Sequence, residues 1–253
     1  MNSPLCYVGG KSQLSKIIID AMPVHTTYVE VFAGAAWVFF RKEPSKVEII
    51  NDFDKELVSF YRVLQNHLEE FMRQFKWLLV SRELFEDAKR QLEADGLTDI
   101  QRAARYYYVQ RQCFGGKIKG RTFGVAIDRP PRINLLRMEE ELSEVHLRLS
   151  RVMVENLDWS ELVRRYDKPA TLFYLDPPYH KMPYYRHNFV EADFFKLAKQ
   201  LDGVQGKFIM SLNDNEFIRE TFKSFNIRTV KLKYSITNNT KSKDGTEVLI
   251  TNF

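Results

Sequence analysis

Apolar residues in the first third of the chain alternate between helical and strand spacing. They recur at helical spacing between residues 12 and 21, and residues 28–32 and 47–50 form short apolar runs typical of buried strands. The small residues at positions 34–36 are expected to open a second helix, and Asp54 is expected to cap a third. This alternation predicts the start of a β/α sheet.

The pattern changes between about residue 55 and residue 150, where helical periods and a glycine-rich loop replace the strands. Strand patterns then resume, and the last two predicted strands have no helix between them, so we expect an antiparallel hairpin. The chain is therefore predicted to be an α/β protein with a sheet from residues 1–54 and 151–253 and a mostly helical domain inserted at residues 55–150. Helices are expected over residues 71–79, 82–92, 100–112 and 133–149, short hairpin arms around 117–125, and strands over 152–155, 171–175, 208–212, 227–233 and 248–252.

Composition narrows the class of protein. The 253 residues are 44% apolar, which is enough for one large domain or two modest ones with a substantial core. No run approaches the roughly 18 continuous apolar residues of a membrane span, and the first residues lack the layout of a signal peptide, so we expect a cytoplasmic protein without a membrane partner. Cys6 and Cys113 lie far apart and lack zinc-ligand spacing, so neither a disulfide nor a metal site is expected.

Positive charge is concentrated in one segment. The net charge of +5 is compatible with a polyanionic partner, although many other proteins share such a value. Residues 111–132 carry six basic residues against the single acid Asp128, and glycines interrupt them. If this segment binds DNA, most of its basic side chains would contact phosphates and one or two would read guanine edges. For any one of them a solvated loop is the alternative. The basic residues are Arg111, Lys117, Lys119, Arg121, Arg129 and Arg132.

The tetrapeptide Asp176-Pro177-Pro178-Tyr179 follows a buried apolar run and suits the binding of a planar amino group. An exocyclic amino nitrogen shares its lone pair with its ring, and two hydrogen-bond acceptors are needed to free that pair. The Asp176 carboxylate and the Pro177 carbonyl can accept the two N–H groups, because proline fixes φ and so the direction of its carbonyl. The ring of Tyr179 offers a stacking face worth about 1–3 kcal/mol to an extruded base.

The same tetrapeptide is also an ordinary way to end a strand, since proline cannot continue the ladder and aspartate favours turns. Its position favours a site, because ligands in open α/β sheets bind beyond the carboxyl ends of strands. The turn after the first strand meets the same criterion. Gly34 lets a ligand approach the backbone, the next helix N-terminus favours a carboxylate, and Asp52 is placed to accept from ribose hydroxyls unless it is merely a cap.

Gly9-Gly10-Lys11-Ser12 has the appearance of a phosphate-binding loop, but the spacing excludes one. The first glycine of such a loop would fall at Leu5, too near the start of the chain for a strand to precede it. A glycine turn before a helix is the simpler interpretation. If Lys11 is functional, we expect it to meet a carboxylate or to lie near the ligand of the first-strand turn.

Four short motifs occur in a particular order. They are Tyr7-Val-Gly-Gly-Lys11, Phe32-Ala-Gly34, Asn51-Asp52 and Asp176-Pro-Pro-Tyr179, with a long insertion before the last. This ordered set resembles the Dam-like N6-adenine DNA methyltransferases, the D12 class or alpha group, and later landmarks extend the resemblance over nearly the whole chain. The resemblance implies an S-adenosyl-L-methionine (AdoMet) dependent, Rossmann-like methyltransferase sheet with an inserted target-recognition domain. Those later landmarks are residues 154–158, 211–214 and 247–253.

The resemblance also implies roles for individual residues. By motif position, AdoMet would be contacted by Tyr7, Gly10 and Lys11, and its methionine end would be lined by Phe32, Gly34 and Ala35. Asp52 would bind the ribose, Asp158 would lie beside the adenine ring, and Asp176 would border the donor. Residues 176–179 match the catalytic motif. We therefore expect a monomer that needs no metal and methylates N6 of an adenine flipped out of double-stranded DNA.

Departures from the family pattern limit what carries over. Ala35 and Ala36 stand where relatives often have glycine or serine, Tyr7 stands where tryptophan is common, and residues 114–124 match the GATC-reading hairpin only loosely, so no recognition sequence is implied. Nothing in the residues specifies a companion nuclease. Two other classes stay open. An RNA or protein-amide methyltransferase would use a similar turn, although protein-amide enzymes usually have asparagine at the place of Asp176, and a catalytically silent DNA-binding relative would tend to lose this acid.

Overall fold

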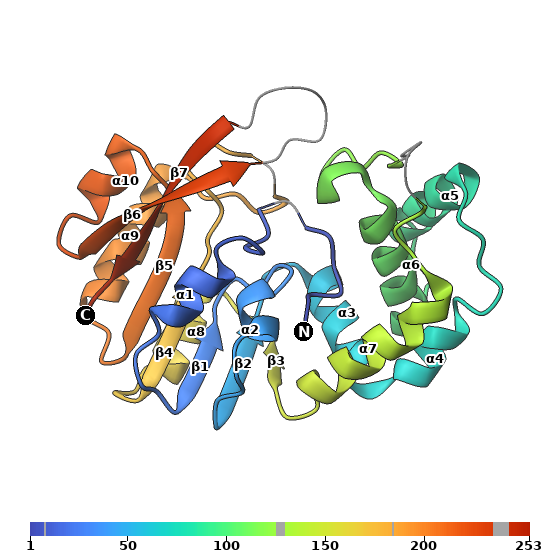
Figure 1. Ribbon diagram of the computed structural model, residues 1–253, viewed down its shortest axis with the longest axis horizontal. Coiled ribbons are helices and arrows are strands. Elements are labelled where there is room, and N and C mark those ends of the chain that lie inside the picture. Colours follow the sequence, from blue (N-terminus) through green and yellow to red (C-terminus); the bar gives the residue numbers. More distant parts are fainter. Residues whose placement is uncertain (8, 125–129, 184, 235–242) are drawn as a thin grey trace.

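The computed structural model describes residues 1–7, 9–124, 130–183, 185–234 and 243–253, and its centre is one seven-stranded sheet (Figure 1). The strand order is β3-β2-β1-β4-β5-β7-β6. The first five strands are mutually parallel, and β7 runs antiparallel to both of its neighbours, so the predicted C-terminal hairpin is confirmed. The strands are β1 (Thr27–Glu30), β2 (Val47–Asn51), β3 (Met153–Glu155), β4 (Thr171–Leu175), β5 (Lys207–Asn213), β6 (Asn226–Tyr234) and β7 (Lys243–Thr251).

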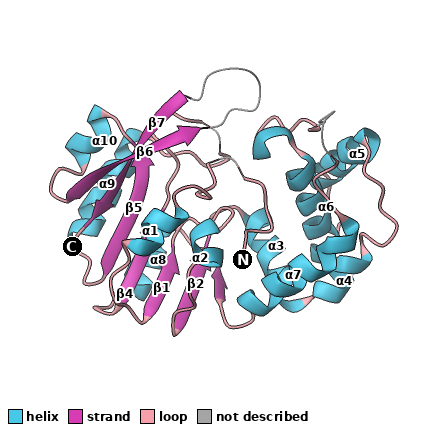
Figure 2. Cartoon of the chain, in the orientation of Figure 1, coloured by secondary structure: helices cyan, strands magenta, loops and turns pink. Residues whose placement is uncertain are grey.

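Helices cover both faces of the sheet, as Figure 2 shows. Successive residues of a strand point to opposite faces. Tyr28 of β1 therefore packs in the apolar cluster with the first helices, whereas Val29 packs in the cluster with the later ones. Asp54 caps α3 as predicted, because its carboxylate accepts the N–H of Glu56. One face carries α1 (Ser15–Asp20), α2 (Trp37–Arg41) and α3 (Lys55–Asn66), and the other carries α8 (Trp159–Tyr166), α9 (Glu191–Asp202) and α10 (Glu216–Thr221).

Beyond α3 the chain forms a helical layer on the right of Figure 1. Phe60 of α3, Tyr107 of α6 and Met138 of α7 belong to the same apolar cluster as Leu172 of β4. The core of the layer is therefore continuous with the core of one sheet face. The layer contains α4 (Leu68–Arg73), α5 (Arg82–Glu93), α6 (Asp99–Gln112), the short 3-10 helix η1 (Phe114–Gly116) and α7 (Leu135–Leu149).

Two local predictions within this layer are corrected. The helix expected over residues 71–79 ends at Arg73, and Trp77 and Leu79 are exposed, so their apolar side chains do not continue a buried helical face. In place of hairpin arms around residues 117–125, the described residues there contain only an isolated bridge between Cys113 and Phe123. Val125 lies outside the described residues.

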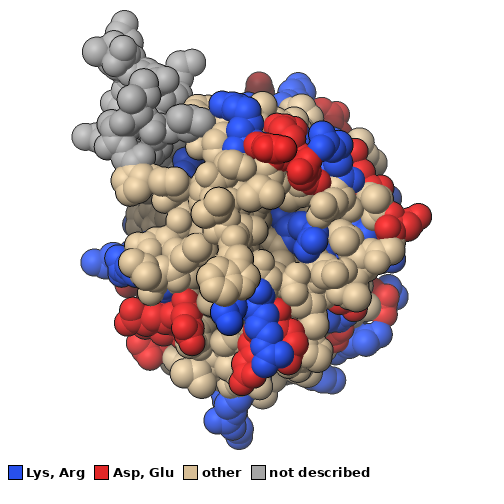
Figure 3. All heavy atoms as spheres, turned by 90° about the vertical axis from the view of Figure 1, so that its right-hand side faces the viewer, with Lys and Arg blue, Asp and Glu red and all other residues tan. Residues whose placement is uncertain are grey.

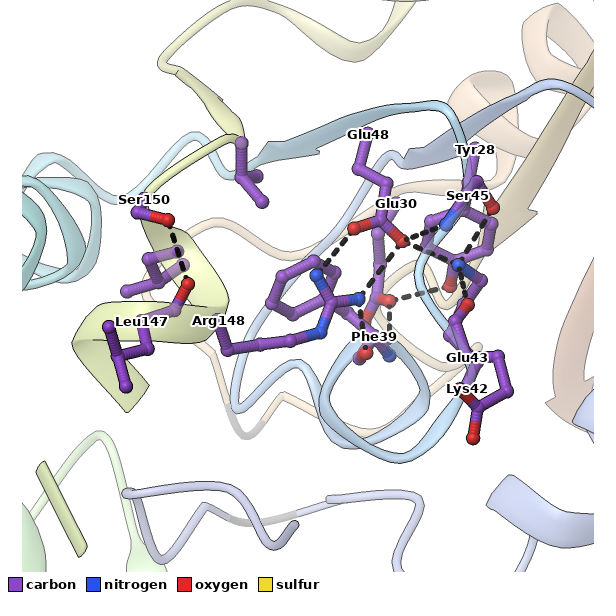
Figure 4. Close-up of polar contacts among 12 residues, drawn as sticks. Tyr28, Glu30, Phe39, Lys42, Glu43, Ser45, Glu48, Leu147, Arg148 and Ser150 are labelled. Atoms are coloured by element: carbon purple, nitrogen blue, oxygen red, sulfur yellow. Dashed lines mark hydrogen bonds and ion pairs between the residues drawn. The ribbon is translucent and has the colours of Figure 1, made fainter. Parts of the chain in front are cut away.

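A buried ionic cluster joins the last helix of the layer to the sheet (Figure 4). Arg148 of α7 pairs with both carboxylate oxygens of Glu48 on β2, and Lys42 Nζ lies 2.5 Å from Glu48 Oε1. Arg148 also donates to the carbonyl of Phe39 and stacks on its ring at 3.8 Å. Burial alone would raise the pKa of Glu48, but the hydrogen bonds from Arg148 and Lys42 hold it below the ordinary value. This cluster fixes α7 against α2, whose N-terminus begins beside the Gly34 turn.

Two further expectations concern membrane-spanning helices and the two cysteines. In the described part of the chain, none of the helices combines the length and apolarity needed to cross a bilayer. Cys6 and Cys113 are both free thiols, and Cys113 is buried with its Sγ 3.3 Å from the carbonyl oxygen of Lys117.

Candidate active site

The loops that follow β1, β2 and β4 surround one cavity. Because these strands are parallel, their carboxyl ends meet at the same edge of the sheet. The loops at residues 31–36, 52–54 and 176–179 begin there, and they contribute walls to a cavity of about 260 Å³. The sequence motifs on these loops are thus brought together by the order of the strands.

Asn51, the last residue of β2, ties three of the surrounding segments together. Its amide donates to the carbonyls of Val31 at 2.9 Å and Leu157 at 3.2 Å, and its side-chain oxygen accepts the N–H of Leu157 at 2.8 Å. The next residues after Asn51 and Leu157 are Asp52 and Asp158, and both line the cavity. Asn51 therefore sets the spacing of two candidate ligand-binding acids, a role that the motif Asn51-Asp52 did not reveal from sequence.

Asp52 is held by the backbone on both sides of its carboxylate. Its Oδ2 accepts the N–H of Gly34 at 2.9 Å, and its Oδ1 accepts the N–H of Asp54 at 2.9 Å. Gly34 has φ +49°, and a Cβ there would lie 3.4 Å from the ring of Tyr7. Burial raises the pKa of Asp52 to about 6, because the backbone donors only partly replace the lost water. Each carboxylate oxygen keeps a second lone pair for a ligand.

Asp158 and the glycine turn, which the sequence motifs predicted to bind the donor, also lie at this cavity. Asp158 is exposed, lines the cavity and caps α8 through the N–H of Ser160 at 2.9 Å. A Cβ on Gly10 would lie 2.9 Å from the indole nitrogen of Trp37, so only glycine fits beside that ring. The predicted donor-binding residues that line the cavity are Tyr7, Gly10, Lys11, Phe32, Gly34, Ala35, Asp52, Asp158 and Asp176.

Lys11 meets the carboxylate of the tetrapeptide motif. Its ammonium lies 2.8 Å from Asp176 Oδ1, donates to the carbonyl of Gly9 and sits 4.6 Å from the ring centre of Tyr179. Lys11 is 6% exposed and Asp176 is 18% exposed at the cavity wall. Burial raises the pKa of Asp176 to about 6, although Lys11 opposes this shift. Asp176 is therefore an accessible carboxylate whose ionisation is costly.

The remaining residues of the motif lie around Asp176 in different settings. Pro178 lines the cavity, whereas Pro177 is buried and, among the described residues, no donor reaches its carbonyl. Tyr179 donates its hydroxyl to the buried Glu247 at 2.5 Å and carries Lys11 over its ring. Pro177 and Tyr179 flank the cavity and are not among its described lining residues.

Aromatic side chains that no motif indicated form much of the wall. The ring of Phe53 meets His187 edge-on at 4.8 Å, and Phe189 contacts both Phe32 and Trp159. Phe53 and Trp159 directly follow Asp52 and Asp158 in sequence, so a motif search extended by one residue would find them. The other lining residues missed by sequence reasoning include Trp37, Ile118 and Asn188. Tyr185 and Arg186, which follow the tetrapeptide motif in sequence, also line the cavity.

The helical layer reaches the cavity through the loop after α6. Ile118 lines the cavity, and the buried amide of Gln110 donates to the carbonyls of Cys6 at 2.7 Å and Gly116 at 2.9 Å. Gly116 has φ +65°, and a Cβ there would lie 2.8 Å from the backbone nitrogen of Tyr7. The loop therefore braces the N-terminal segment that carries Tyr7.

The basic residues of segment 111–132 are placed unequally. Lys117 and Lys119 are exposed. Arg121 is only 7% exposed and lies over the ring of Tyr106. Arg111 and Arg132 donate to backbone carbonyls within the chain, and Arg129 lies outside the described residues. The face of the helical layer shown in Figure 3 mixes basic with acidic side chains, so it presents no uniformly positive surface.

Comparison with known proteins identifies the class that this cavity and motif order define. Residues 7–236 match the family model of the D12 class N6 adenine-specific DNA methyltransferases. The match covers most of the chain, and the protein belongs to this family. The resemblance inferred from the motif order is confirmed, and with it an AdoMet-dependent enzyme that methylates adenine in DNA.

Characterised relatives align along almost the full chain. The type II methyltransferase M1.LlaDCHI of Lactococcus lactis subsp. cremoris is 29% identical over 98% of this chain and 94% of its own length. The type II methyltransferase M.MjaIII of Methanocaldococcus jannaschii is 26% identical over 98% of both chains. The DNA adenine methylase of Escherichia coli (strain K12) is 23% identical over 97% of this chain and 93% of its own. The chain thus spans nearly the whole of each relative.

Proposed function

We propose that the protein, as a cytoplasmic monomer, methylates N6 of an adenine rotated out of double-stranded DNA, with the cavity at the strand ends as the donor pocket. The observation that carries this assignment is the Asp176 carboxylate, which borders the cavity while one of its oxygens is held by Lys11. AdoMet, when bound, supplies a methyl group that its sulfonium already activates. The residues of the chain therefore have to orient and polarise the amino group.

The lining of the cavity fits a nucleoside-bearing donor. Phe32, Phe53 and Trp159 provide aromatic walls, and the carboxylates of Asp52 and Asp158 provide acceptors for ribose hydroxyls and an adenine amino group. Gly34 keeps the backbone open beside Asp52, in the same cavity that Lys11 and Asp176 line. This arrangement supports the placement of the donor with its reactive end at Asp176.

The tetrapeptide would bind the target amino group through two acceptors. Asp176 and the carbonyl of Pro177 each take one N–H, which frees the nitrogen lone pair for in-line attack on the methyl group. The base would stack on the ring of Tyr179, and this stacking with the amino hydrogen bonds would offset the few kcal/mol of base extrusion. Asp176 does not act as a strong base, since the nitrogen becomes acidic once it is methylated.

We propose that residues 55–150 form a target-recognition domain and that Lys117 and Lys119 contact the DNA phosphates. Both lysines are exposed on the loop after α6. Arg111, Arg121 and Arg132 instead brace this loop from inside. Replacing Lys117 and Lys119 together by Gln should reduce the slope of log affinity against log salt by about 2, because each phosphate contact contributes roughly 0.9. Replacing the exposed Lys196 and Lys199 of α9 is the control, and an equal slope change there would contradict the assignment.

The reaction is tested by following isotopic methyl groups from AdoMet into DNA, RNA and protein side by side. The wild type should label DNA alone, at adenine N6, whereas Asp176→Ala should lower the rate by roughly 10²–10³ or more, the loss typical of a key electrostatic group. Donor binding by this variant should persist, and Asp202→Asn on the exposed surface should behave as wild type. Label in RNA or protein, or wild-type turnover by Asp176→Ala, would contradict the proposal.

A further inference from the structure

Behind Asp176 lie two buried hydroxyls to which the sequence motifs assign no role, those of Tyr174 and of Ser211, the first residue of the landmark 211–214. Leu175 of β4 pairs with Met210 of β5, so the next residues along the two parallel strands, Asp176 and Ser211, are also adjacent. Ser211 Oγ lies 3.1 Å from Asp176 Oδ1, and the hydroxyl of Tyr174 lies 3.0 Å from Ser211 Oγ. Ser211 is fully buried and Tyr174 is 1% exposed.

When Asp176 is ionised, the hydroxyl hydrogens of Ser211 and Tyr174 can point in one direction only. A carboxylate accepts and cannot donate, so Ser211 must donate its single hydroxyl hydrogen to Asp176. Tyr174 must then donate to Ser211. The bonds run from Tyr174 through Ser211 to Asp176, and each polarises the next.

Both charged and neutral donors hold the same oxygen of Asp176. Lys11 and Ser211 approach Oδ1, whereas within the described residues neither a hydrogen-bond donor nor a cation pairs with Oδ2. We infer that Ser211 and Tyr174 are positioning residues for methyl transfer, which fix Oδ1 so that Oδ2 is presented to the target amino group. This inference rests on the proposed function of Asp176 and extends it to two residues on the sheet.

The pH dependence of the reaction should report on this chain of bonds. The charged and titratable groups that influence Asp176 are Lys11 from the N-terminal segment and Glu247 from β7, together with Glu30, Tyr174, Tyr179 and Tyr185. The Ser211 hydroxyl stabilises the ionised form and lowers the pKa of Asp176 against the effect of burial. Without that hydroxyl the pKa of Asp176 rises, so the carboxylate becomes protonated at a higher pH as the pH falls. The acid limb of kcat/KM should therefore move to higher pH.

The experiment compares Ser211→Ala and Tyr174→Phe with Tyr108→Phe. Tyr108 is a matched control, because it is a buried tyrosine of α6 whose hydroxyl accepts the backbone N–H of Ser81 at 3.2 Å and, in the described part of the chain, has no bond to Ser211 or Asp176. We expect Ser211→Ala to lower kcat roughly 10- to 100-fold, the effect of losing one bond to a charged group. Its acid limb should move to higher pH, while the Kd for AdoMet and for DNA stays unchanged. Tyr174→Phe should shift both quantities in the same direction by less, and Tyr108→Phe should shift neither.

The outcomes separate this inference from the proposed function. A wild type that fails to methylate DNA would overturn the function itself. A wild type that is active while Ser211→Ala keeps its rate and its acid limb would overturn the positioning role alone. The same holds if Tyr108→Phe moves the acid limb as far as Tyr174→Phe, or if lost AdoMet binding accounts for the lost rate. Should Ser211→Ala fail to fold, Tyr174→Phe decides between these results.

Discussion

Two carboxylates of the same sheet, one buried and one partly exposed at the cavity wall, have opposite environments. Glu48 on β2 has both oxygens engaged by cations, Arg148 and Lys42, and its pKa is lowered. Asp176, at the end of β4, has one oxygen held by Lys11 and Ser211, and its pKa is raised to about 6. The first joins a helix to the sheet, and the second borders the cavity.

Glu48 and Asp176 differ in whether the protein itself supplies a partner for both carboxylate oxygens. A buried carboxylate that finds all its partners within the protein stabilises the fold, or at least leaves no uncompensated charge. One that keeps an oxygen toward a cavity retains part of its desolvation cost, and such groups gather at functional sites. Glu30 on β1 represents a third case. Among the described residues, the hydroxyl of Tyr28 and the backbone of Phe39 are its hydrogen-bond donors, and burial raises its pKa to about 8.

The largest expected effect comes from breaking the saturated cluster. Glu48→Gln leaves Arg148 and Lys42 without their counter-charge, and should lower the free energy of unfolding at pH 7 by about 3–5 kcal/mol. The folded pKa of Glu48 is lowered, so wild-type stability from this group is present above about pH 4.5 and is lost as pH falls through the folded pKa. Urea unfolding across this pH range measures both. Glu161→Gln, in an exposed pair with Arg165, should cost under about 1 kcal/mol, and equal losses would remove the distinction.

The same substitution at Glu30 should have the opposite effect on the free energy of unfolding. Its folded pKa of about 8 lies above the ordinary 4.5, so the wild type loses stability as pH rises from about 4.5 to 8, where only the unfolded chain ionises freely. Glu30→Gln keeps a neutral acceptor for Tyr28 and should raise the free energy of unfolding at pH 7 by roughly 1–3 kcal/mol. Its stability should also be flatter with pH over this range. Destabilisation at pH 7 would mean that Glu30 is paired like Glu48.

The sequence predicted the edge of the sheet where the site lies, because strand period and motif order are local signals. Gly34, Asp52 and Asp176 could be placed at that edge before any coordinates. Ser211 and Gly116 could not, since their roles depend on a neighbouring strand and on a loop about a hundred residues away from Tyr7. The predicted helix over residues 71–79 was too long for a related reason, since apolar residues at its end do not distinguish a buried face from an exposed turn.

The smallest effect concerns Asp52, whose oxygens serve both the backbone and, in our proposal, the donor. Asp52→Asn should raise the Kd for AdoMet about tenfold, because one bond to a charged acceptor is lost. Asp167 provides the matched control, since it accepts the backbone N–H groups of Gln205 and Gly206 far from the cavity. Asp167→Asn should lose comparable backbone support yet bind AdoMet as the wild type does. Isothermal titration without DNA measures both variants. If the two change donor affinity equally, Asp52 acts only through the turn that it braces, and its open lone pairs have no part in holding the donor.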